Sequence, residues 1–248
     1  MGEKSAWVES HLDIVLVPAG FLMLVIYHGC LLHKILTHPQ ATFVGINTIH
    51  RQAWVQAIMK DGMKNGVLAV QTIRNGIMAS TLLASTAITL CSVVGLLVGM
   101  GGSPNELTFY GMTGPLTSSV KFLVLLGCLL VAFLCHVQCV RYYSDVSFLI
   151  ITPPASPEME DFHVEYVSSM FKKGAYFWSV GLRAFYLCVP LFLWNFGPIP
   201  MFVASCLLLV FLHSLDRPGE DLSAVHDIKS SKRTKKIGHL PFMHRDVS

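Results

Sequence analysis

The sequence has 248 residues, of which 53% are hydrophobic and only 13% are charged, and its mean hydropathy is +0.56. Soluble domains carry about 25% charged residues, so this composition excludes an ordinary soluble domain and indicates a membrane protein. The formal net charge of +3 is too small to indicate nucleic-acid binding. No Gly- or Ser-rich linker divides the chain, which predicts a single helical bundle.

The apolar runs, taken in chain order, predict an all-helical, polytopic transmembrane bundle, because roughly 20 apolar residues span about 30 Å of hydrocarbon. The first run has neither a basic leader nor a small-residue cleavage site and is interpreted as a retained span. The last apolar stretch is interrupted at Asn195–Pro200, where glycine and proline favour a tight turn, so it is divided in two. The expected spans are residues 14–32, 76–100, 122–140, 175–194 and 199–215.

Two polar stretches are expected to form amphipathic helices on the cytosolic side of the bundle. The first runs from His50 into Lys64, and on a helix Trp54 shares an apolar face with Ile58. This segment either lies in the membrane interface or packs on the bundle as a loop helix. The second begins at Ser156, a capping residue followed by proline and an acidic first turn.

The distribution of Lys and Arg predicts the topology. Residues 33–74 hold five, residues 141–183 hold four and the segment from residue 216 onward holds seven. Cytoplasmic loops are enriched in Lys and Arg, and five spans with an external N-terminus place sixteen of the eighteen on the cytosolic side. The alternative of four spans divides them equally, so five spans are preferred.

In this five-span topology several polar residues lie at a similar depth near the cytosolic side. Polar groups inside a membrane are costly and often mark functional sites, so these residues are candidates for a ligand or lipid-headgroup pocket. The alternative is that the Arg side chains snorkel and the histidines are hydrogen-bonded between helices. The candidate pocket residues are Arg74, Asn75, Arg141, Arg183, His28 and His136.

Span two also carries small residues, which allow close approach of helix backbones in a membrane. They predict a packing face, within the chain or between copies, and are Gly76, Ser80, Ala84, Gly95 and Gly99. Residues 1–215 are thus assigned to the bundle, and residues 216–248 to a basic tail that is expected to be disordered. The tail either binds anionic lipid or only completes the orientation signal; its basic cluster is Lys229, Lys232, Arg233, Lys235 and Lys236.

No zinc-type ligand pair, phosphate loop or paired-carboxylate site is found in the sequence. All seven cysteines lie in apolar runs and are interpreted as small hydrophobic residues rather than disulfides. His28 and His136 could together ligate a haem, but two core histidines without a haem are favoured. We therefore expect no metal, no cofactor and no enzymatic activity.

Several longer motifs resemble a plant multi-pass membrane family that is catalogued as domain of unknown function 599. The resemblance covers about residues 10–216 and lies in His50–Trp54, Asn65–Asn75, Met78–Thr81, Ser119–Phe122, Arg141–Ser144, Gly181–Tyr186 and Leu193–Pro200. It implies an integral membrane protein of a plant cell, in the plasma membrane or an endomembrane. It implies no particular activity.

Two functions are consistent with these observations. The first is a membrane scaffold or accessory subunit that contacts lipid and a membrane-protein partner or a second copy, because span two carries small residues and the tail is basic. The second is a carrier or channel for a small anionic solute, because Arg74, Arg141 and Arg183 are expected at one depth. The scaffold is preferred, since the spans lack the broken helices and carboxylates that many carriers contain.

Overall fold

A computed structural model of the chain describes residues 2–38, 42–99, 115–154 and 156–216. All regular structure in these residues is helical. The helices are α1 (Gly2–Thr37), α2 (Phe43–Lys60), α3 (Gly62–Gly99), α4 (Pro115–Leu149), the short 3₁₀ helix η2 (Pro157–Met159), α5 (Glu160–Trp194) and α6 (Pro198–Asp216).

Five of the helices are long and apolar enough to cross a membrane, and α2 is the exception among the longer ones. The candidate spans are residues 13–37, 64–96, 118–149, 157–194 and 198–216. Large apolar side chains are exposed along them, among them Val67, Leu82 and Leu123 at 78%, 68% and 67%. Apolar surface of this extent suits hydrocarbon rather than water, so the predicted all-helical membrane bundle with five long apolar helices is confirmed.

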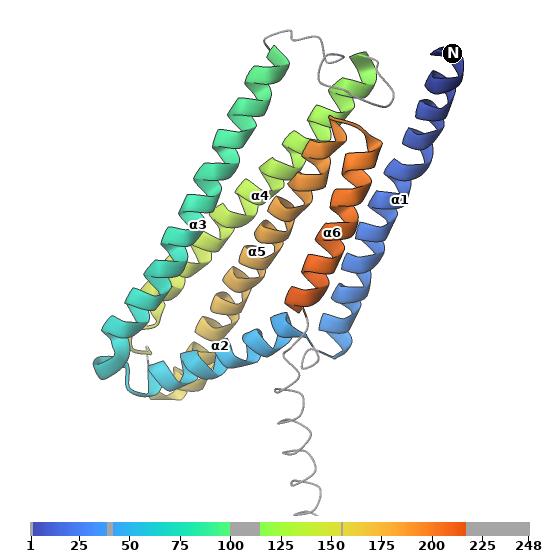
Figure 1. The fold of residues 1–248 in the computed structure, drawn as a ribbon. Coiled ribbons are helices and arrows are strands. Elements are labelled where there is room, and N and C mark those ends of the chain that lie inside the picture. The colour runs from blue at the N-terminus through green and yellow to red at the C-terminus, as the bar shows by residue number, and fades with distance from the viewer. Residues whose placement is uncertain (1, 39–41, 100–114, 155, 217–248) are drawn as a thin grey trace, which may run out of the picture.

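The five long helices follow one another in the order α3, α4, α5, α6, α1, and each packs chiefly on its neighbours in that order (Figure 1). Helix α2 lies across one end of this row, where α1, α4 and α6 end and α3 and α5 begin (Figure 1). We call this the α2 end. The helices α3 and α1 therefore form the two edges of the row.

The apolar face predicted for the first amphipathic segment packs against the bundle. Val55 and Ile58 are buried in a cluster with residues of α3, α4 and α5. The Trp54 ring lies 5.6 Å from the Phe171 ring of α5. Helix α2 begins earlier than expected, at Phe43, where the side chain of Thr42 caps it by accepting a hydrogen bond from the Gly45 amide.

The second predicted surface helix is not a separate element. The chain starts to turn at Ser156 and Pro157 as expected, but η2 leads directly into α5, which continues to Trp194. Lys172 and Lys173 interrupt the apolar pattern without interrupting the backbone hydrogen bonds, because lysine is a good helix former. The two lysines therefore mark where the apolar part of α5 begins, but the helix itself begins earlier, at Glu160.

A tight turn joins α5 to α6 at the end of the row opposite α2. Gly197 has φ of 144°, a conformation that residues with a Cβ rarely adopt, and Pro198 then starts α6. The division of the last apolar stretch into two helices is confirmed. Near this turn a second core cluster joins Val94, Leu125, Leu129, Cys188 and Leu191, with Phe21 and Trp194 packed against it.

Candidate functional site

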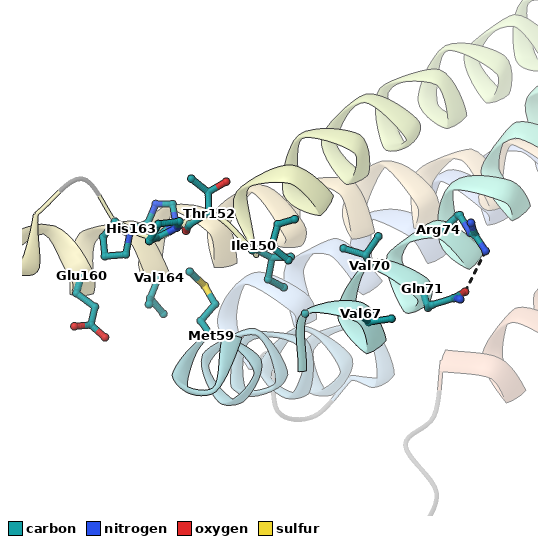
Figure 2. Close-up of a pocket in the computed structure, with 14 residues that line it drawn as sticks. Met59, Val67, Val70, Gln71, Arg74, Ile150, Thr152, Glu160, His163 and Val164 are labelled. Atoms are coloured by element: carbon teal, nitrogen blue, oxygen red, sulfur yellow. Dashed lines mark hydrogen bonds between the residues drawn. The ribbon is translucent and has the colours of Figure 1, made fainter. Parts of the chain in front are cut away.

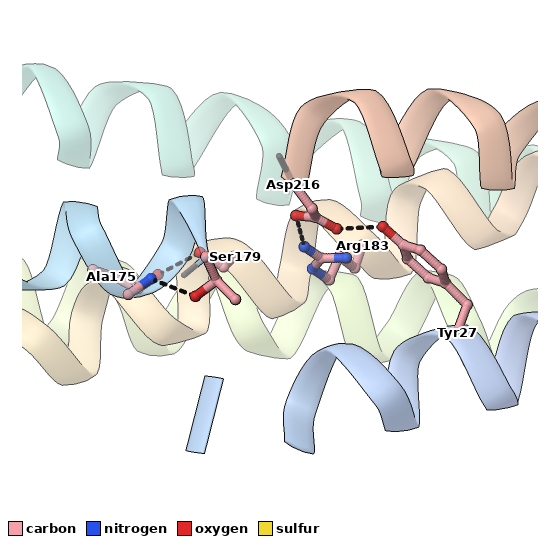
Figure 3. A network of polar contacts seen from close by, with 7 residues as sticks. Tyr27, Ala175, Ser179, Arg183 and Asp216 are labelled. Atoms are coloured by element: carbon pink, nitrogen blue, oxygen red, sulfur yellow. Dashed lines mark hydrogen bonds and ion pairs between the residues drawn. The ribbon is translucent and has the colours of Figure 1, made fainter. Parts of the chain in front are cut away.

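A polar network joins three helices at the α2 end of the bundle. Asp216, the last residue of α6, accepts a hydrogen bond from the Tyr27 hydroxyl of α1 at 2.6 Å. Its other carboxylate oxygen lies 2.5 Å from Nη2 of Arg183 on α5. Figure 3 shows the carboxylate between the guanidinium and the phenol.

The charges in this network compensate one another. A carboxylate at the C-terminus of a helix is unfavourable because the helix dipole is negative there. Arg183 supplies the opposite charge, and its side chain and that of Asp216 are only 18% and 10% exposed. Hydrogen bonds between charged groups are stronger than neutral ones, so this contact holds the end of α6 against α5.

A pocket of about 550 Å³ lies beside this network, between α2, α5 and α6. We call it the α2 pocket. Arg51 reaches it from α2, Arg183 from α5 and Asp216 from α6. The side chain of Arg51 is fixed, because its Nη1 donates to the Tyr143 hydroxyl at 2.9 Å and its guanidinium lies 5.5 Å from the centre of the Phe171 ring.

A larger pocket of about 700 Å³ lies at the same end, between α3 and the segment that joins α4 to α5. Figure 2 shows Glu160 and His163 at one end of it and Arg74 with Gln71 at the other. Nε2 of His163 lies within hydrogen-bond distance of the carbonyl oxygens of Leu149 and Thr152, at 3.2 and 3.1 Å. His163 thus ties the connection to the end of α4.

The residues predicted to share one pocket are distributed over the bundle. Arg74 and Asn75 are exposed on α3, and Arg74 donates to Gln71 of its own helix at 3.2 Å. Arg141 is exposed on α4. Arg74 lines the pocket of Figure 2, while Arg183 lines the α2 pocket.

The two histidines of the predicted set lie in different surroundings. Nδ1 of His28 is 2.8 Å from the Leu24 carbonyl of its own helix, and the ring borders a third, apolar pocket of about 430 Å³. His136 of α4 is fully buried between the rings of Trp178 and Phe185, at 5.4 and 5.7 Å. Among the described residues neither ring nitrogen of His136 has a hydrogen-bond partner.

The small residues of α3 divide into a buried group and an exposed one. Ser80 and Ala84 are buried, and a Cβ at Gly76 would lie only 2.9 Å from the ring of Tyr143 on α4. This part of the face is used within the chain, for packing α3 on α4. Gly95 is exposed, and Gly99 is the last residue of α3.

Residues 15–220 match the family of proteins of unknown function DUF599. The chain belongs to this family. The family part of the resemblance is therefore confirmed, and the match includes all three residues of the Asp216 network. No match was found among the curated proteins or among the solved structures.

For this DUF599 protein, the two arginines of the α2 pocket provide hydrogen-bond donors and positive charge rather than a nucleophile or a general base. In the described part of the chain no three His, Cys, Asp or Glu residues group as metal ligands. All seven cysteines lie in the described residues and are free. The basic cluster from Lys229 to Lys236 lies outside the described residues.

Sequence reasoning missed Asp216, Tyr27 and Arg51 as members of the polar site. Asp216 directly follows the last apolar run, at the point where the tail was expected to begin. An acid at the end of one span, with an arginine within the preceding apolar span, is the sequence signal that would have found the pair. Nothing in the sequence indicates that Tyr27 contacts this pair, because α1 and α6 are far apart along the chain.

Proposed function

We propose that this protein crosses the membrane five times, with the α2 end in the cytosol, and acts without catalysis as a scaffold or accessory subunit. The proposal rests on a single observation, which is that the side of α3 facing away from α4 is exposed. We call this side the outer face of α3. This helix lies at an edge of the row, with α4 as its neighbour along its length and α2 near its start. Much of its surface is therefore free to contact another protein.

The outer face of α3 has the composition of a helix-packing surface. Exposed hydroxyl residues recur at intervals of four, four and three, which places them on one side of the helix; they are Thr81, Ser85, Thr89 and Ser92. Each donates to a carbonyl oxygen one turn earlier, at 2.8 to 3.0 Å. The hydroxyl protons are thus bonded within α3, and these short side chains allow a partner helix to approach closely.

Small residues and hydroxyls at a membrane helix surface favour association, because they let backbones approach closely and can form hydrogen bonds between helices. Gly95 extends this surface: among the described residues, a Cβ there would meet no heavy atom within 4 Å. Large apolar side chains such as Leu82 and Leu96 are also exposed on α3, but α4 has no hydroxyl residue of the Ser or Thr type between Lys121 and Tyr143. The outer face of α3 therefore favours a protein partner over lipid.

Site-specific photocross-linking in the cell's own membranes tests this proposal. A photoreactive phenylalanine analogue at Ser85 is expected to give a discrete adduct with another membrane protein or with a second copy. The same analogue at Leu123, which is exposed on α4, is the control and is expected to label lipid. Failure to obtain an adduct from Ser85 would contradict the proposal.

Two glycines provide matched variants for the same experiment. Gly95 on α3 and Gly127 on α4 are both exposed, and a Cβ at either meets nothing within 4 Å in the described structure. Gly95→Leu is expected to reduce the adduct, because a large side chain separates the backbones. Gly127→Leu is expected to leave it unchanged, and an equal loss in both variants would argue against a specific surface.

The α2 pocket supports a second function, a carrier or channel for a small anionic solute, since two arginines line it. Anion flux into liposomes that disappears in Arg183→Ala would favour this function. The scaffold remains preferred because Asp216 neutralises Arg183 and because the helices form an open row. The resemblance to a plant family further supports the plasma membrane or an endomembrane of a plant cell as the location.

A further inference from the structure

The α2 pocket combines positive charge with an apolar wall. Arg51, Arg183 and Asp216 line it, and their side chains together carry one net positive charge. Apolar side chains of α2, α5 and α6 complete the wall, among them Val44, Leu182 and Leu212. A suitable ligand therefore has an anionic group next to an apolar one.

The arginines have unused hydrogen-bond donors. A guanidinium carries five N–H donors. Arg183 uses Nη2 on Asp216, whereas its Nη1 is buried and has no partner among the described residues. Buried donors are nearly always satisfied in folded proteins. Arg183 therefore has hydrogen-bond donor capacity beyond its contact with Asp216.

The position of the pocket indicates which anion is available. It lies at the α2 end, where the apolar run of α6 ends at Asp216. If the five helices span a bilayer, this level corresponds to the lipid headgroups, and basic pockets between membrane helices at such a level bind phospholipid headgroups. Arginine also matches the geometry of phosphate oxygens.

We propose that the α2 pocket binds a phosphate group, carried by a phospholipid headgroup, between Arg51 and Arg183. The acyl chains would lie along the exposed apolar surfaces of α5 and α6. This inference requires the membrane-spanning arrangement, but it does not depend on the scaffold function. Loss of the Ser85 cross-link would leave it intact.

Thermal unfolding of the full chain in an uncharged detergent tests the proposal. Dihexanoyl phosphatidylglycerol is expected to raise the Tm with a saturable dependence on concentration. Arg51→Gln is expected to raise the half-saturating concentration about tenfold or more, because a charge-assisted hydrogen bond is lost. The control Arg141→Gln removes an exposed arginine from α4 and is expected to bind like the wild type.

Inorganic phosphate distinguishes the two sources of the ligand. A saturable shift with the lipid but not with equal concentrations of phosphate identifies a lipid headgroup. Equal shifts with both identify a phosphate site without an acyl contribution. No saturable shift with either probe, or the same loss in Arg51→Gln and Arg141→Gln, would overturn the proposal.

A second variant and a wild-type measurement keep the test independent of the folding of Arg51→Gln. Thr48 lines the pocket, and its hydroxyl donates only to its own helix, at the Val44 carbonyl. Thr48→Trp should fill the pocket and abolish the saturable shift, and wild-type affinity in this variant would overturn the proposal. In the wild type, a photoreactive phosphatidylglycerol should label α2 and α5, and labelling confined to other helices would also overturn it.

Discussion

Gly174 of α5 lies directly against the ring of Tyr143 on α4, so close that a Cβ at position 174 would be 2.5 Å from Cε1 of the ring. On the other side of the ring, Gly76 of α3 makes a similar approach. Tyr143 is thus held between two glycines from two helices. This arrangement fixes the spacing of α3, α4 and α5 at the α2 end.

Gly174→Ala is expected to destabilise the protein by about 1–3 kcal/mol, because the added methyl group forces Tyr143 or a helix to move. The measurement is thermal or denaturant unfolding in detergent. Gly127→Ala is the control, since a Cβ at that exposed position has open space within the described structure. It is expected to be neutral or to stabilise by about 0.5–1 kcal/mol through helix propensity.

Tyr27→Phe is expected to lower stability by about 1.5 kcal/mol, because it removes a hydrogen bond to the Asp216 carboxylate. The ring itself remains, so packing of α1 changes little. Tyr166→Phe, at an exposed position of α5, is the matched control and should unfold like the wild type. Equal stability of Tyr27→Phe and the wild type would show that this hydrogen bond contributes nothing to holding α1 on α6.

A double-mutant cycle tests the pair of Arg183 and Asp216. Each single change, Arg183→Gln or Asp216→Asn, is expected to cost about 2–3 kcal/mol, because it leaves the partner's charge largely buried and unpaired. The double variant should cost about 1–2 kcal/mol less than the sum of the two, since contacting residues are coupled. Strictly additive losses would indicate that the two side chains do not interact in the membrane protein.

Tyr143→Phe is expected to loosen α2, because the phenol is the acceptor for Nη1 of Arg51. Amide hydrogen exchange of residues 43–60 should become faster, whereas exchange in α4 should change little. Tyr142→Phe is the control, because the Tyr142 ring stacks on Phe177 and phenylalanine preserves that contact. Unchanged exchange in α2 of Tyr143→Phe would mean that packing of Val55 and Ile58 alone holds the helix.

The apolar runs predicted the number and the order of the long helices, because burial in hydrocarbon demands about 20 apolar residues whatever the tertiary structure. The turn at Gly197 was also predicted correctly, because glycine and proline favour a turn whatever the tertiary structure. The extent of α5 was not, because Lys172 and Lys173 change hydropathy without breaking a helix.

The polar site was harder to predict than the fold. Depth along the spans indicated where Arg74, Arg141 and Arg183 would lie, but it did not indicate the direction in which each side chain points. Arg74 and Arg141 are exposed, whereas Arg183 is partly buried and pairs with Asp216. Such pairing depends on helix rotation, which tertiary packing sets and which a single sequence does not reveal.

Five membrane crossings with the α2 end in the cytosol underlie both the proposed function and the proposed lipid site. The most direct test is the sidedness of the two termini, measured with protease-cleavable tags at each end in sealed vesicles of known orientation. We expect cleavage of the N-terminal tag only from the external side and of the C-terminal tag only from the cytosolic side. Cleavage of both tags from the same side would contradict five crossings and would remove the α2 pocket from its proposed level at the inner headgroups.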